Sequence, residues 1–323
     1  MRAVVFQNGA VTVAGRPDPR PLGSELVVRT WAAGLNGADS LQRRGRYPPP
    51  AGIDPDIPGL EMAGIVEAVG PEVRRFAPGD RVMGLLGGGG QAERTRIHER
   101  VAMPIPDGVG WATAGGFPET FTTAHDALVT QAELRSGERI LVHGAAGGVG
   151  TAAVQIASLL GARVTATVRR ESSRTAVAEL GAEVLDPKAD WGSRGPFDVV
   201  LELVGAPNLD QDLQALGSGG RIVVIGIGAG AHADLNLGLL MARRGVIRGS
   251  TLRARSLEDK ALAARRVERE LLPWLATGRL RVLVEAEWPL VAAAEAYRQF
   301  EAGGTVGKIV LRAGPPDGGD ADD

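Results

Sequence analysis

Short apolar runs alternate with longer amphipathic stretches through the middle of the chain. The runs predict strands that end at His143 or span residues 163–168, 183–186, 197–204 and 221–225. The segments between them have helical patterns, and strands that alternate with helices are typical of a parallel sheet. We therefore predict a doubly wound parallel sheet from about Thr120 to Arg255, with Val246–Leu252 as a further strand at its edge.

The flanking segments have a different pattern. Residues 1 to about 118 contain short apolar runs interrupted by Gly and Pro, at 25–32, 63–69 and 81–85, which predict a compact, irregular β domain. After Arg255 the pattern predicts a charged helix, a second helix and a closing strand, at 257–272, 292–301 and 308–311. Residues 313–323 carry two prolines and four aspartates, so we expect this tail to be disordered.

A cluster of four glycines follows the first strand of the predicted parallel sheet. Gly144, Gly147, Gly148 and Gly150 lie between His143 and a helical run that extends to Leu160. Glycines let the backbone approach a pyrophosphate, and the helix N-terminus offers unpaired N–H groups. The next strand follows one helix later, which completes a βαβ unit. We predict a dinucleotide site at Ala146, Gly147, Gly148 and Val149; a purely structural turn is the alternative.

The end of the second strand indicates which dinucleotide is preferred. Dinucleotide sites usually place an acidic residue there, but this strand ends in Val168-Arg169-Arg170, and Glu171 follows. A carboxylate repels a 2′-phosphate, whereas a guanidinium binds it with hydrogen bonds of about 1.5–3 kcal/mol each. We therefore favour NADPH over NADH and assign Arg169, Arg170 and Arg174 to the phosphate. The alternative is that these arginines only solvate a loop.

Two further strand ends carry glycines. They occur at Val204-Gly205 and at Gly226-Ile227. Ligands of parallel sheets lie at the carboxyl ends of the strands, so we predict that these four residues contact the nicotinamide side of the cofactor. An ordinary strand-to-loop glycine is the alternative at both places.

Composition narrows the class of protein. A chain of 323 residues favours two domains, and its 44% hydrophobic content is typical of soluble globular proteins. A net charge of −2 gives no electrostatic reason to bind nucleic acid or membranes. With no membrane-spanning stretch and no signal peptide, we expect a cytoplasmic protein. Because the chain has no cysteine and only four scattered histidines, we predict no thiol chemistry and no metal site.

Motifs along nearly the whole chain resemble those of a known family. They are Ala33–Asp39, Leu41–Pro50, Ile57–Gly64, Pro78–Val82, Leu86–Ala92, Pro118–Ala124, the turn at 143–151, and Gly307–Leu311. On these motifs the chain resembles the zinc-independent quinone oxidoreductases of the medium-chain dehydrogenase/reductase superfamily. Within them it is most similar to the tumour-suppressor-inducible quinone reductase subgroup.

The resemblance implies a fold and an activity. The fold would be α/β, with a chaperonin-10-like β-barrel domain formed by residues 1–118 and 259–312. Residues 119–258 would form the NADPH-binding Rossmann domain, and the active site would lie between the two. The activity would be hydride transfer from NADPH to a quinone or a related activated enone. Members of the family are often homodimers joined through an edge strand, here Val246–Leu252.

The resemblance also implies roles for individual residues. Asn36 and Thr123 would lie near the nicotinamide, Lys308 would reach toward the cofactor, and Tyr47 would line the substrate cleft. A phenol beside a quinone stacks on it or donates a proton, so Tyr47 and Asn36 are the catalytic candidates. The alternatives are that Tyr47 packs under three prolines and that Asn36 caps a helix. Arg253 and Arg255 are expected to face the cleft or a dimer edge.

The chain departs from parts of the superfamily pattern. Zinc-dependent relatives place a Cys at Asn36 and a His at Leu60, and they insert a four-cysteine zinc lobe where this chain has Met83–Gln91. All of those ligands are missing here, so a Lewis-acid mechanism would have no metal. Some relatives bind the 2′-phosphate with a Lys and a Tyr where this chain has Ser173 and Pro187, which leaves that role to the arginines.

Two other functions are compatible with the same sequence. One is an enoyl-thioester reductase of the same superfamily, for which Arg43, Arg44 and Arg46 would bind a phosphopantetheine or coenzyme A. The other is a non-catalytic NADPH-binding protein, which would bind the cofactor without turnover.

Overall fold

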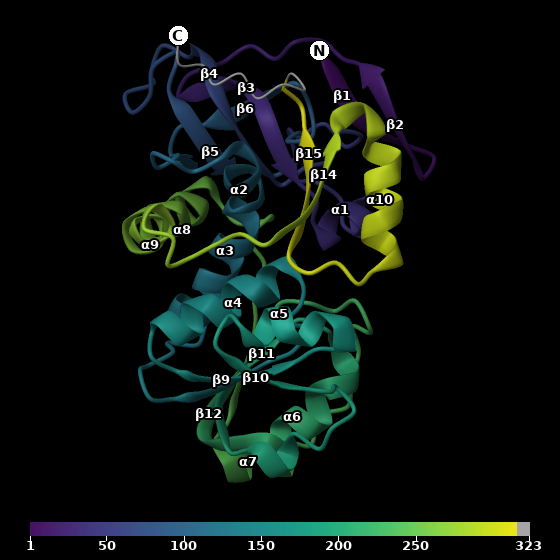
Figure 1. Ribbon diagram of the computed structural model, residues 1–323, viewed down its shortest axis with the longest axis vertical. Coiled ribbons are helices and arrows are strands. Elements are labelled where there is room, and N and C mark those ends of the chain that lie inside the picture. The colour runs from purple at the N-terminus through teal and green to yellow at the C-terminus, as the bar shows by residue number, and fades with distance from the viewer. Residues whose placement is uncertain (315–323) are drawn as a thin grey trace. The chain divides into compact units, whose positions relative to one another are not determined.

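The computed structural model describes residues 1–314, which group into two compact units (Figure 1). Unit 1 comprises Met1–Thr122 and the chain from Leu252 onward, and unit 2 comprises Thr123–Thr251. The domain boundaries expected from the sequence lie nearby, at 118/119 and 258/259. Most of the tail expected to be disordered, residues 315–323, lies outside the described residues. Ala313, at its start, donates its N–H to the Trp31 carbonyl.

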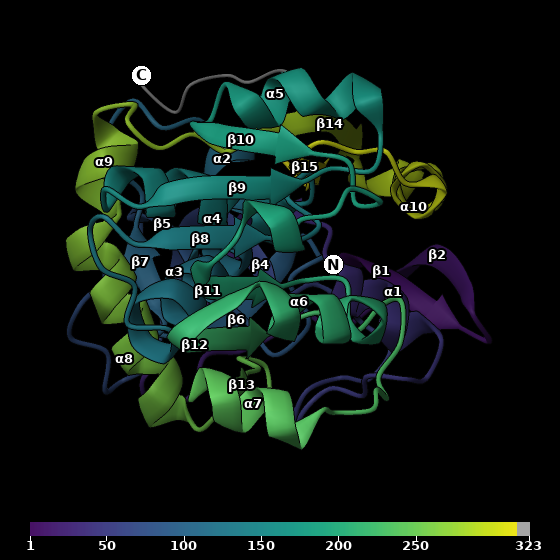
Figure 2. The same cartoon turned by 90° about the horizontal axis from the view of Figure 1, so that it is seen from below.

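Unit 2 is built on a six-stranded parallel sheet with the strand order β10-β9-β8-β11-β12-β13 (Figure 2). The strands are β8 (Arg139–Val142), β9 (Arg163–Thr167), β10 (Ala182–Leu185), β11 (Phe197–Glu202), β12 (Leu216–Val224) and β13 (Val246–Gly249). The helices are α4 (Gly148–Leu159), α5 (Arg174–Ala178), α6 (Leu209–Ala215) and α7 (Leu237–Arg243). The central strands β8 and β11 are almost wholly buried and their middle residues are apolar, as expected for parallel strands covered on both faces. The predicted doubly wound sheet is confirmed, and β13 is its edge strand.

Unit 1 is mainly antiparallel β structure. Its larger sheet has the order β14-β15-β3-β4-β5-β7, with β6 paired to β3, and β1 and β2 form a separate hairpin. The strands are β1 (Arg2–Gln7), β2 (Ala10–Gly15), β3 (Glu25–Gly34), β4 (Glu61–Val69), β5 (Arg81–Leu85), β6 (Arg94–His98), β7 (Ala102–Pro104), β14 (Val284–Pro289) and β15 (Lys308–Arg312). Among the described strands of unit 1, only β14 and β15 pair in parallel. The C-terminal strands therefore complete the sheet that the N-terminal segment begins.

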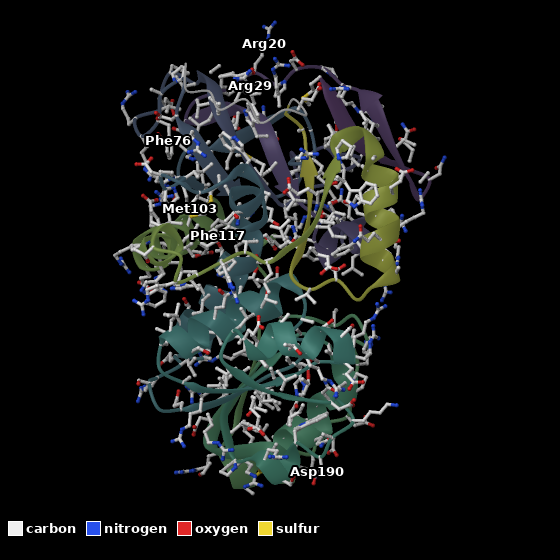
Figure 3. The ribbon with its side chains drawn as sticks, viewed as in Figure 1. Arg20, Arg29, Phe76, Met103, Phe117 and Asp190 are labelled. Atoms are coloured by element: carbon white, nitrogen blue, oxygen red, sulfur yellow. The ribbon has the colours of Figure 1, made fainter. Side chains whose placement is uncertain are left out.

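Unit 1 also contains helices. They are α1 (Gly37–Arg43), α2 (Trp111–Gly116), α8 (Leu257–Glu270), α9 (Leu272–Ala276) and α10 (Ala293–Ala302); α3 (Pro118–His125) crosses the boundary between the units. Phe117, labelled in Figure 3, lies at the junction of α2 and α3 and stacks on Phe121 at 4.5 Å between ring centroids. Among residues 1–314 no helix is long and apolar enough to cross a bilayer.

Candidate functional site

The glycine turn of unit 2 connects β8 to the N-terminus of α4. Gly144 adopts a φ of 63°, in the left-handed region that favours glycine. A Cβ on Gly150 would lie 2.5 Å from Ala145 Cα, so this glycine is required for the helix to pack against the turn. Gly147 is exposed, and a Cβ there would meet nothing closer than 3.7 Å. The turn thus presents open backbone beside the first N–H groups of α4, which have no partner within the helix.

The other predicted cofactor residues of unit 2 lie at the same edge of the sheet. A Cβ on Gly144 would lie 3.3 Å from a methyl group of Val204, so the turn is adjacent to the loop after β11. The Ala229 N–H donates to the Val204 carbonyl at 2.9 Å, which ties this loop to the one after β12. Cβ atoms on Gly205 and Gly226 would clash with backbone of the facing loop at 2.5 Å and 2.1 Å. Close packing between the two loops therefore requires both glycines, whatever they bind.

The three predicted arginines after β9 differ in their exposure and contacts. Arg169 and Arg170 are exposed. Arg174 instead donates to the Asp186 carboxylate at 2.5 Å and to the Val168 carbonyl at 3.3 Å. The Lys188 backbone N–H and Arg174 together hold the pKa of Asp186 below its usual value. Arg174 is thus already engaged, and Arg169 and Arg170 are the more accessible cations.

A buried polar network that was not foreseen from the sequence lies beneath the glycine turn. His143 contacts Asp212 Oδ1 through Nε2 at 2.7 Å and Thr167 Oγ1 through Nδ1 at 2.9 Å. Glu202 accepts hydrogen bonds from the N–H groups of Val204 and Gly205, and burial raises its pKa. His143, Glu202 and Asp212 lie close enough to hold a metal ion, but the Glu202 oxygens already accept from backbone and from Asn208. The network fixes the loop after β11, and of its described carboxylate oxygens Asp212 Oδ2 is left without a partner.

Unit 1 contains a second buried network, formed where three strands end. Register pairs Gly34 of β3 with Val310 of β15, and Ala32 with Ala63 of β4. This register brings together Asn36, just after β3, Glu61 at the start of β4 and Lys308 at the start of β15. Lys308 Nζ donates to Glu61 Oε1 at 2.6 Å, to Asn36 Oδ1 at 2.7 Å and to the Leu35 carbonyl at 2.6 Å. Asn36 Nδ2 also donates to Glu61 Oε1, at 2.9 Å.

Two more carboxyl groups adjoin this network. Asp39 is fully buried and accepts from the N–H groups of Asn36 and Gly59, at 2.9 Å and 3.2 Å. Burial raises the pKa of Asp39 to about 6, against the opposing effect of those hydrogen bonds. Glu119, at the start of α3, donates its backbone N–H to Glu61 Oε2 at 2.9 Å. Burial and the negative charge of Glu61 raise the pKa of Glu119 to about 8.

Tyr47 is held by Arg253. The Arg253 guanidinium lies 5.1 Å from the centre of the Tyr47 ring and donates to the Tyr47 carbonyl at 2.8 Å. It also donates to the Gly87 carbonyl and to Gln42 Oε1. Arg253 is almost fully buried, and all of these partners belong to unit 1. It stabilises the segment that carries Tyr47.

The predicted site residues divide between the two units. Asn36, Tyr47 and Lys308 belong to unit 1, and only Asn36 and Lys308 of these touch each other. Thr123, the turn residues, the arginines and the two glycine loops belong to unit 2. Asn36 is the N-cap residue of α1, where the Asp39 side chain accepts from its backbone N–H, and its own side chain also binds Glu61 and Lys308. No local sequence signal could have revealed that Glu61 and Glu119 belong to this network, because their proximity to Asn36 and Lys308 depends on strand order.

The unit 1 network does not fit a zinc ion. The Asn36 and Glu61 oxygens both accept from the Lys308 ammonium, so a cation of the protein itself occupies their centre. The side chain at position 60 is a leucine, and the chain offers no thiolate. Soft sulfur or imidazole ligands, which zinc prefers, are therefore lacking at this place.

Comparisons with known proteins agree with this architecture. Residues 23–133 match the alcohol dehydrogenase GroES-like domain, and residues 148–269 match the zinc-binding dehydrogenase family. The chain is 32% identical to the quinone oxidoreductase of Homo sapiens over 330 residues, which cover 96% of this chain and 97% of that protein. These matches confirm the predicted chaperonin-10-like and Rossmann domains.

Solved structures show the same similarity. The quinone oxidoreductase of Pseudomonas syringae pv. Tomato DC3000 superposes with a TM-score of 0.86 at 30% identity, covering 97% of this chain and 100% of that one. Mycobacterial Rv1454c, solved in complex with NADPH, has a TM-score of 0.87 at 28% identity with the same coverage. The chain therefore belongs to the medium-chain dehydrogenase/reductase superfamily of NAD(P)-dependent oxidoreductases.

Proposed function

We propose that this protein is a zinc-independent, NADPH-dependent reductase that transfers a hydride to a quinone or a related activated enone. The preference for NADPH over NADH rests on one observation. Arg169 and Arg170 are exposed at the end of β9, where NAD-binding proteins usually have a carboxylate. The full-length similarity to quinone oxidoreductases supports the substrate class. The placement of Lys308 between Asn36 and Glu61 supports chemistry without zinc.

The residues of this chain bind and orient the reactants. The N–H groups at Ala146–Val149 suit a pyrophosphate, because they lie at the positive end of α4. The Asn36 amide is held on both sides by Glu61 and Lys308, and we propose that it contacts the nicotinamide. Tyr47, whose ring is held by Arg253, stacks on the substrate. Bound NADPH supplies the hydride, and the protein contributes orientation and a low-dielectric site.

The test is NADPH oxidation by the purified protein with an ortho-quinone and, in parallel, with crotonyl-coenzyme A. The proposal expects faster turnover of the quinone. Faster turnover of the thioester would instead identify an enoyl-thioester reductase. Tight NADPH binding with negligible turnover across a broad quinone panel would identify a non-catalytic NADPH-binding protein.

We also propose that the protein is a homodimer. Leu237 and Met241 lie one helical turn apart on α7, and their side chains are 63% and 76% exposed. Val246, on the adjacent edge strand β13, is exposed as well. An apolar face beside an unpaired sheet edge favours pairing with a second copy.

A further inference from the structure

Glu119 differs from the other acids of the unit 1 network in its contacts. Its backbone N–H is bound to Glu61, which fixes the residue at the first turn of α3. Its side chain is only partly buried, whereas Glu61 and Asp39 are completely enclosed. Within residues 1–314 the Glu119 carboxyl makes no hydrogen bond or ion pair, whereas Glu61 pairs with Lys308 and Asp39 accepts from backbone N–H groups.

Lys308 and Tyr297, which also carry protons in this network, use them in hydrogen bonds within unit 1. Lys308 has three N–H bonds, and all three are directed at acceptors inside unit 1, at 2.6–2.7 Å. The Tyr297 hydroxyl is fully buried and bonds to Gln91 Oε1 at 2.9 Å. Of this network's described groups, only the Glu119 carboxyl is uncommitted to a partner, and it belongs to a residue that is not completely enclosed.

Burial and the Glu61 charge favour the neutral form of Glu119. Glu61 on β4 and Asp39 on α1 oppose ionisation, while Lys308 on β15, Arg253, and Lys260 on α8 favour it. Because Lys308 is already paired with Glu61, burial and the Glu61 charge prevail, and the pKa of Glu119 is raised to about 8. A carboxyl group at this position therefore carries a proton at neutral pH.

We propose that Glu119 is the proton donor of the reductase reaction, an inference that rests on the proposed function. The hydride, with its electron pair, adds to the quinone or to the β-carbon of the enone and leaves an oxyanion on the substrate. The Glu119 O–H bond then breaks, its proton passes to that oxyanion, and the hydroquinone or enol is released. The resulting carboxylate takes a proton from water, so that one NADPH and one proton are consumed for each substrate reduced.

The test compares Glu119→Gln with the wild type, with Asp107→Asn as a matched control. Asp107 is an exposed acid on a turn of unit 1, away from the network. For the wild type, kcat with the quinone should fall as pH rises through about 8. Glu119→Gln should lower kcat about 10²-fold and remove this pH step, since a general acid typically contributes that much. NADPH affinity, followed by fluorescence, should stay within about twofold.

Three further measurements decide the inference. Glu119→Asp keeps the acid and should recover part of kcat and the pH step. Tyr47→Phe should retain the step; if Tyr47→Phe removes it and Glu119→Gln does not, Tyr47 is the donor and the inference fails. The infrared difference spectrum of wild type minus Glu119→Gln at pH 7 should contain the carbonyl stretch of a protonated carboxyl group.

The possible failures are distinguishable. An active wild type whose kcat and pH profile survive Glu119→Gln overturns the proton donor and leaves the reductase assignment intact. A wild type that binds NADPH and reduces neither quinone nor enone overturns the proposed function. The absence of the protonated-carboxyl band at pH 7 overturns the inference in either case, because Glu119 would then be ionised.

Discussion

Arg169 and Arg170 allow the cofactor preference to be tested at single side chains. We expect Arg169→Ala combined with Arg170→Ala to weaken NADPH binding at least about tenfold, because each lost charge-assisted hydrogen bond contributes about 1.5–3 kcal/mol. NADH binding should not change. Arg163→Ala is the matched control, since Arg163 is an exposed arginine at the opposite end of the same strand. An unchanged ratio of the two dissociation constants in the double variant would refute the assignment.

The buried carboxyl of Asp39 predicts a pH-dependent stability. Its pKa is about 6 in the folded protein, against an ordinary value of 3.8, so the folded state retains the proton over a pH range where the unfolded chain releases it. The Asp39 contribution to the free energy of unfolding therefore decreases by about 3 kcal/mol as pH rises from about 4 to 6. Asp39→Asn removes that dependence.

Urea unfolding of the two proteins measures the difference. We expect the destabilisation caused by Asp39→Asn to be larger at pH 4 than at pH 7. A difference between variant and wild type that stays constant across this range would show that Asp39 has no raised pKa in the folded state.

Individual residues also show where prediction from sequence stops. The roles of the exposed arginines and of the glycine turn could be predicted from the sequence because they depend on neighbours within one βαβ unit. Asn36 and Lys308 were named through a resemblance, but their contact with Glu61 was not foreseen. The contact joins residues far apart in the chain, and it exists because β15, β3 and β4 are adjacent in the sheet. Gly34 lacks a side chain for the same reason, since a Cβ there would lie 2.3 Å from Glu61 Oε1.

At the scale of elements, two glycines at the N-terminus of α4 have different expected roles, one in packing and one in cofactor binding. Gly150→Ala should destabilise unit 2 by about 1–3 kcal/mol, because its Cβ would overlap Ala145. Gly147→Ala should leave stability unchanged and weaken NADPH binding about tenfold or more, because the new methyl group would lie on the exposed glycine turn that we propose binds the pyrophosphate. Thermal unfolding and NADPH titration measure the two effects.

Gly110→Ala provides the control for Gly147→Ala. Gly110 precedes α2 with φ and ψ of −73° and 160°, close to the −72° and 170° of Gly147 before α4, and a Cβ there would meet nothing within 4 Å. It should change neither stability nor cofactor binding. If Gly147→Ala binds NADPH as tightly as Gly110→Ala does, the turn is structural only.

Element type was predicted better than element boundaries. Every predicted strand of unit 2 is present, because apolar runs bounded by turn residues are a local signal. β12, however, begins at Leu216 instead of 221, since glycines at its start hid the extended segment from the apolar pattern. The helix predicted over 257–272 is divided near Leu271, and Pro273 lies in the first turn of the second part, where proline is tolerated.

For the whole molecule, local sequence patterns are the poorest guide to one feature. The chain returns to unit 1 after it has formed unit 2. The segment after Leu252 supplies β14 and β15, and β15 pairs antiparallel with β3 at Val310 and Gly34. Tyr297 on α10 is completely buried and packs edge-on against Phe6 of β1 at 5.4 Å. Only the resemblance to a family indicated this arrangement, because hydrophobic periodicity does not specify which distant strands pair.

The proposed homodimer makes the last prediction. The wild type should have twice the chain mass of 33.6 kDa in sedimentation velocity. Leu237→Glu combined with Met241→Glu should shift it to the single-chain mass, because burying two charges in an apolar contact is unfavourable. Leu262→Glu is the control: Leu262 is 60% exposed on α8 of unit 1, so its mass should remain that of the wild type. A wild type of single-chain mass would refute the dimer, and a double variant that stays dimeric would move the interface away from α7.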